Sequence, residues 1–188
     1  MIVARTPIDP PSDAVALSGE EHFSGLDARV RDFWRFAMSD LRMNNTRGYL
    51  AEFLVAQALG LSEVKRVEWD AYDLLFEGIR IEVKSSAYLQ AWPQERLSRI
   101  GFSGLRSTAT DGTRALMADV YVFCVQASTT HVGYDPLDRE QWKVHVVGRE
   151  ALTSAGESIA YGTVRALSRE PIPWEGLSTA VRRAAPRG

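Results

Sequence analysis

Two carboxylates and a lysine stand close together in the stretch YDLLFEGIRIEVKSS, which spans residues 72–86. They are Asp73, Glu82 and Lys84, and the chain contains only two other lysines. Carboxylate oxygens bind hard divalent cations such as Mg²⁺, and a nearby ammonium group can orient water or neutralise developing charge. Residues of these types at this spacing could carry out metal-dependent hydrolysis of a phosphate ester.

A β-hairpin would bring these residues together. Glu77 and Gly78 can form its two-residue turn, because glycine adopts at little cost the positive φ that such a turn requires. In that register Asp73 lies opposite Glu82, and Lys84 is diagonal to Asp73 on the same face. Opposed carboxylates repel each other unless a cation lies between them or one of them takes up a proton. The pair is therefore a candidate metal site; the alternative interpretation is an exposed strand face with solvated charges.

The hairpin belongs to a predicted sheet of about five strands. The second hairpin strand alternates between a core face and a functional face, because side chains alternate along a strand. The core face carries Ile79, Ile81 and Val83, and the other, which we expect to line a surface, carries Arg80, Glu82 and Lys84. Strands are predicted over 64–69, 72–76, 79–86, 118–127 and 141–147, and RIGFSG (99–104) is a further candidate.

A first helix is predicted over 26–43, where apolar residues recur at helical spacing, with Ser24 as its N-cap. Asn44 and Asn45 are expected to break it. Helical segments are also predicted after the sheet, over 149–155, 160–167 and 174–184.

A second helix, predicted over 46–59 and ended by Gly60, carries a further carboxylate. The helix is apolar on nearly all sides, as expected for one that is buried against a sheet. Glu52 lies within it, and a carboxylate in such a setting needs a partner. A bond to a neighbouring arginine would be a purely structural alternative to a catalytic role.

At these residues the sequence resembles the PD-(D/E)xK superfamily of restriction-endonuclease-like nucleases. RGYLAEFLVAQALG offers Glu52, AYDLLF offers Asp73, and IEVKSS offers Glu82 and Lys84. The strand DVYVFCVQ corresponds to the core strand that follows the second helix of that family. The proline that often precedes the family's aspartate is replaced by Tyr72, and Asp70 is close enough to compete for the aspartate role.

The resemblance implies an α/β restriction-endonuclease-like core, with a central mixed β-sheet flanked by helices, and an Mg²⁺- or Mn²⁺-dependent endonuclease acting on nucleic acid, expected to be DNA. Asp73, Glu82 and Glu52 would hold the metal and Lys84 would orient water or steady charge at phosphorus. A catalytically inactive nucleic-acid-binding or assembly module on the same fold is the alternative, and a homodimer is an open possibility.

Several residues after the Glu-x-Lys pair are candidates for contacts with nucleic acid. Ser86, Tyr88 and Gln90 continue the parity of the functional face if the strand persists. Aromatic side chains can pack on bases, and arginines can contact phosphate, although solvated or structural roles are equally open. The further candidates are Trp92, Arg96, Arg99, Arg106 and Arg114.

Composition restricts the class of protein. The chain has 188 residues, 45% hydrophobic and 24% charged, with a net charge of −2. We expect one domain over 1–188, with a loosely ordered lead-in (1–23), a nuclease-like core (24–150) and a C-terminal helical extension (151–188). No apolar run approaches the roughly 18 residues that would span a membrane. A single cysteine, Cys124, excludes an internal disulfide, and the absence of a signal-peptide layout favours a cytoplasmic location.

Overall fold

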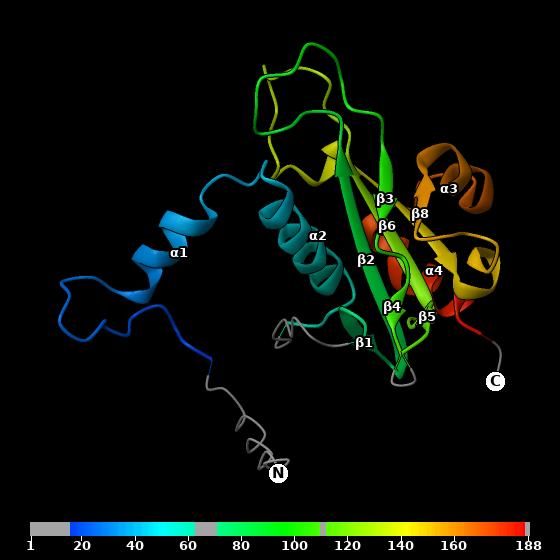
Figure 1. The fold of residues 1–188 in the computed structure, drawn as a ribbon, viewed down its shortest axis with the longest axis horizontal. Coiled ribbons are helices and arrows are strands. Elements are labelled where there is room, and N and C mark those ends of the chain that lie inside the picture. The colour runs from blue at the N-terminus through cyan, green and yellow to red at the C-terminus, as the bar shows by residue number, and fades with distance from the viewer. Residues whose placement is uncertain (1–15, 63–70, 110–111, 187–188) are drawn as a thin grey trace, which may run out of the picture. The chain divides into compact units, whose positions relative to one another are not determined.

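The computed structural model describes residues 16–62, 71–109 and 112–186 (Figure 1). The chain divides into two compact units, Met1–Ser39 and Asp40–Gly188. Within the described ranges, no helix is long and apolar enough to cross a membrane. The predicted boundaries of the lead-in, core and extension stay predictions.

The first unit contains helix α1, Val30–Met38, which is shorter than the predicted helix over 26–43. Its N-cap is Arg29 and not Ser24, and the Arg29 N–H donates to the Asp32 carboxylate at 2.8 Å. The residues before it cannot be helical because His22 and Arg29 form an antiparallel β-bridge. The prediction of the start of this helix was therefore wrong.

The second unit begins with α2, Asn44–Ala58, the helix that carries Glu52. Asn44 and Asn45 belong to its first turn, so the prediction that they break the helical structure was wrong. The break lies earlier, over 39–43. Gly60, with φ of +75°, follows the end of the helix, as predicted. The positive φ explains why a glycine stands there, since other residues adopt it at a cost.

The central sheet is mixed and has the strand order β1-β2-β6-β7. Strands β2 and β6 are parallel, whereas β1 pairs with β2, and β7 with β6, in antiparallel fashion. The prediction of an α/β protein with a mixed sheet is confirmed. Four strands are described in place of about five, and the predicted strand over 64–69 lies outside the described residues. The bounds are Leu74–Phe76 for β1, Ile79–Ala87 for β2, Val120–Gln126 for β6 and Trp142–Gly148 for β7.

Each face of this sheet is covered by its own apolar cluster. On one face, helix α2 and helix α4, Leu177–Ala184, pack on residues such as Ile81 and Val83. On the other face, Tyr121, Phe123 and neighbouring side chains pack under helix α3, Tyr161–Ser168. The face of β2 that we expected to line a surface is thus partly covered. Apolar residues on both faces explain why β6 is buried along its whole length.

The connection between β2 and β6 contains short strands and, in its described residues, no helix. The helix that the family resemblance implies before β6 is therefore not found in 88–109 or 112–119. The elements there are β3, Gly101–Ser103; β4, Ser107–Thr108; and β5, Arg114–Ala115.

The C-terminal part mixes helices with one strand that the sequence pattern did not indicate. That strand is β8, Ser158–Ala160, and it pairs with β3 in a separate two-stranded sheet. The segments predicted as helical form α3, α4 and short 3₁₀ turns. These turns are η2, Arg149–Leu152, and η3, Trp174–Gly176; a further one, η1, is Arg139–Gln141.

Candidate active site

The hairpin has the predicted register. Leu74 pairs with Ile81, and Phe76 pairs with Ile79. The turn residues Glu77 and Gly78 have φ of +51° and +81°, as a two-residue turn of this kind requires. The spacing of the candidate residues on the two strands therefore follows from a local turn.

Asp73 lies at the point where β1 begins to pair with β2. Its N–H donates to the Ile81 carbonyl at 3.0 Å, and its carboxylate accepts the Val83 N–H at 2.7 Å. The Asp73 backbone is therefore bonded to Ile81 and its side chain to Val83, the residues that precede and follow Glu82 on β2. Burial raises the pKa of Glu82, and the negative charge of Asp73 raises it further.

Glu82 and Lys84 form a half-buried ion pair. The Lys84 ammonium lies 2.6 Å from the Glu82 carboxylate, and the two side chains are 21% and 14% exposed. Burial, followed by the charge of Asp73, raises the pKa of Glu82, and Lys84 only partly opposes this shift. Two carboxylates and one ammonium leave an excess of negative charge in a poorly solvated place. A divalent cation would relieve it.

Two neighbours of this pair could not be recognised from the sequence pattern. Tyr121 is the register partner of Glu82 on the adjacent strand β6, and burial together with the Glu82 charge raises its pKa to about 12. Gly104, with φ of +67°, approaches the Lys84 ammonium so closely that an added Cβ would lie 3.6 Å from it. Backbone after β3 therefore lies against Lys84.

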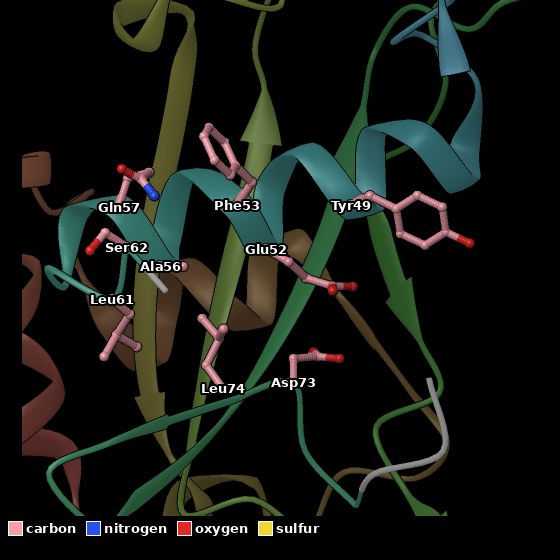
Figure 2. A pocket seen from close by; sticks show the side chains of 9 residues that line it. All are labelled: Tyr49, Glu52, Phe53, Ala56, Gln57, Leu61, Ser62, Asp73 and Leu74. Atoms are coloured by element: carbon pink, nitrogen blue, oxygen red, sulfur yellow. The ribbon is translucent and has the colours of Figure 1, made fainter. Parts of the chain in front are cut away.

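Glu52 comes from α2 and lines a cavity together with Asp73. Figure 2 shows the Glu52 side chain extending from α2 toward the side on which the Asp73 carboxylate lies. Within 16–62, 71–109 and 112–186, no three or more His, Cys, Asp or Glu side chains form a group that could hold a metal ion. Asp73 and Glu82 are linked by the effect of the Asp73 charge on the Glu82 pKa, and a metal contact by these two residues or by Glu52 stays a prediction.

Gln90 lies inside the protein, only 7% exposed. Its amide donates to the Ala87 carbonyl at 2.9 Å and to the Ser98 hydroxyl at 3.1 Å. Its carbonyl oxygen accepts a long bond, 3.4 Å, from the buried guanidinium of Arg47 near the start of α2. In this state Gln90 ties the loop after β2 to α2, and the predicted contact with nucleic acid stays a prediction.

The other candidates for nucleic-acid contact differ in accessibility. Arg96, Arg99 and Trp92 are exposed, whereas Ser86 and Tyr88 are half-buried on or just after β2. Arg106 donates to the Ala155 carbonyl at 3.0 Å and thereby fastens a loop. Arg114 is exposed but pairs with Glu157.

Two groups with reactive chemistry are held in inert settings. Cys124 is fully buried in β6, and burial raises the pKa of its thiol to about 12. His145 is buried in β7 between the Ser168 hydroxyl at 2.7 Å and the Tyr161 hydroxyl at 3.1 Å, and burial lowers its pKa. These settings are typical of residues with a structural role.

Comparison of the chain with protein-family models, with curated proteins and with solved structures gave no match. Any functional conclusion therefore rests on the residues and geometry described above.

Proposed function

We propose that the chain is a metal-dependent phosphodiesterase that cuts nucleic acid, in the first place DNA. The observation that carries this proposal is the half-buried arrangement of Asp73, Glu82 and Lys84. A structural hairpin gains nothing from two carboxylates that oppose each other's ionisation, so the pair requires another explanation. Hard oxygen ligands with an adjacent ammonium fit Mg²⁺ or Mn²⁺ and a phosphate.

Asp73 and Glu82 would hold the metal, and each is already fixed by the protein. Asp73 is fastened through the Val83 N–H, and Glu82 is held by Lys84. A bound divalent cation would activate water and neutralise charge on the phosphate. Lys84 would then direct its ammonium at the attacking water or at the developing negative charge. Glu52 would support the site from α2.

A catalytically inactive binding module on the same fold is the second candidate. It is favoured by the finding that the described residues contain no group of three metal-binding side chains. Two carboxylates with water and phosphate oxygens are nevertheless enough for Mg²⁺, which usually keeps several waters. The enzyme therefore remains our first proposal.

The test is cleavage of plasmid and single-stranded DNA with Mg²⁺, Mn²⁺ or EDTA. We expect metal-dependent cutting that falls at least about 100-fold in Lys84→Ala and in Asp73→Asn, as is typical when a group acting on the reacting atoms is removed. Lys143→Ala is the matched control, because Lys143 is an exposed lysine on β7.

Three outcomes are informative. Cutting that survives both site substitutions would show that the site is assigned to the wrong residues. Binding without cutting, on every substrate and with each metal, would favour the inactive module. Equal losses in Lys143→Ala would show that the charge of a lysine, and not its place in the site, is what matters.

A further inference from the structure

The cavity beside the candidate site has the chemistry of a small ligand pocket. Its volume is about 190 Å³, and α2 forms one side of it (Figure 2). Ala56, Leu61 and Leu74 give it an apolar lining, while Glu52 and Asp73 belong to it as well. An apolar lining with a few polar groups is the usual composition of a site for a small organic molecule.

Size and charge narrow the class of ligand. Pockets for drug-sized molecules measure roughly 300–1,000 Å³, so this smaller space suits a single ring system. Where no metal ion neutralises them, the two carboxylates disfavour a phosphate or any other anion inside the cavity, because like charges in a partly buried place repel. They can accept hydrogen bonds from a neutral ring that carries N–H groups. A nucleobase has this size, this neutrality and these donors.

Phe53 and Gln57 offer groups at the cavity that could bind a nucleobase. Both belong to α2 and line the cavity, and Phe53 is 57% exposed, so its ring is accessible to a ligand. Figure 2 shows the two side chains rising on the same side of the helix. An exposed aromatic ring offers a surface on which a base can stack, and an amide can pair with the edge of a base.

We propose that this cavity, here called the base pocket, receives one unpaired nucleobase next to the phosphate bound at Asp73 and Glu82. The inference rests on the proposed function and narrows its substrate to nucleic acid that is single-stranded at the site of cutting. A base paired within a duplex cannot enter the pocket unless it leaves the stack, which costs free energy. Phe53 acts here as a binding residue and takes no part in the chemistry.

The test is binding of two labelled strands to the full chain, measured by fluorescence anisotropy with Mg²⁺ in a Lys84→Ala background to prevent cutting. One strand is an oligothymidylate of about 12 nucleotides, within the range of single-strand binding sites. The other has the same sugar-phosphate backbone without bases. We expect Phe53→Ala to weaken binding of the oligothymidylate about ten-fold, the usual effect of losing one stacked base, and to leave the strand without bases unaffected.

Two control variants distinguish the loss of base stacking from general damage to the protein. Phe36→Ala removes another phenylalanine, 87% exposed on α1, and should change neither strand. Phe53→Trp retains a ring for stacking and should restore binding. Equal weakening of both strands by Phe53→Ala, no effect of that substitution, or no binding of the oligothymidylate to the Lys84→Ala protein would each overturn the base pocket.

The outcome is distinguishable from that of the cleavage test. Metal-dependent cutting without an effect of Phe53→Ala would remove the base pocket and keep the nuclease. Base-dependent binding without cutting by the unmodified chain would keep the pocket and remove the nuclease in favour of a binding module.

Discussion

The folded protein disfavours the ionised form of Glu82. Its pKa is raised from 4.5 because it is half-buried beside Asp73, so the folded protein binds a proton at Glu82 more readily than the unfolded chain does. Stability therefore falls as the pH rises from 4.5 through the raised pKa, and ionised Glu82 is a cost at neutral pH. Residues that cost stability in this way are found mainly at functional sites.

Glu82→Gln should make the metal-free protein more stable. The substitution removes one of two neighbouring carboxylates and leaves Asp73 and Lys84 with balanced charges. At pH 7 in EDTA we expect a gain of about 0.5–2 kcal/mol, the usual range for stabilising substitutions, measured by urea unfolding. The gain should disappear below pH 4.5, where Glu82 is protonated in both states.

Glu77 provides the matched control from the same hairpin. A hydrogen bond from Arg182 lowers the pKa of Glu77, so its ionised form favours folding and Glu77→Gln should reduce stability at pH 7. Loss of stability in Glu82→Gln as well would contradict the view that Glu82 opposes folding.

At the scale of elements, β7 and α4 approach each other so closely that only glycine fits. A Cβ added to Gly148, at the end of β7, would lie 2.3 Å from the Ala184 carbonyl oxygen of α4. Gly148→Ala should therefore displace the helix and cost about 1–3 kcal/mol, as overpacking usually does. Thermal unfolding followed by circular dichroism would measure the loss.

Gly162→Ala in α3 is the appropriate comparison, since an added Cβ there meets nothing within 4 Å. Alanine favours helix over glycine, so this variant should be unchanged or slightly more stable. Equal stability of the two alanine variants would show that the contact between Gly148 and Ala184 relaxes without cost.

The hairpin could be predicted because its determinants are local. The glycine of the turn and the alternation of Ile79, Ile81 and Val83 specify both register and face. The neighbourhood of Tyr121 could not be predicted, because it depends on parallel pairing between β2 and β6, whose register partners Glu82 and Tyr121 are far apart in sequence. The side chains and helix that cover the second face of the sheet could not be predicted for the same reason. Strand β3 pairs with β8, which lies far from it in sequence.

The ends of helices were the least predictable feature of the fold. Apolar spacing continues before α1, yet a β-bridge between His22 and Arg29 takes those residues out of the helix. Gln90 illustrates a similar limit for the site. Parity along β2 predicted a place on the functional face, but the strand ends at Ala87 and the side chain turns inward to Arg47.

At the scale of the whole molecule, the candidate site belongs to one unit. Residues 40–188 contain both apolar clusters as well as Asp73, Glu82 and Lys84. A fragment that starts at Asp40 should therefore fold cooperatively and, on the proposed function, cut plasmid DNA as the full chain does. Circular dichroism and the plasmid assay would establish both properties.

A second fragment, 60–188, is the control for the fragment that starts at Asp40. It lacks α2, which contributes Ala51 and Val55 to the cluster on one face of the sheet, so it should fail to fold. Failure of the fragment 40–188 as well would show that the unit does not fold independently.

The order in which the ribosome makes the chain adds a consequence for timing. Leu177 and Val181 of α4 complete the apolar cluster that holds β2 in place, whereas Glu82 is synthesised 99 residues before Val181. At the usual pace of translation this interval lasts roughly 5–20 seconds. Throughout it the hairpin lacks its final support, so a nascent chain should not yet hold Asp73, Glu82 and Lys84 in the geometry of the finished protein.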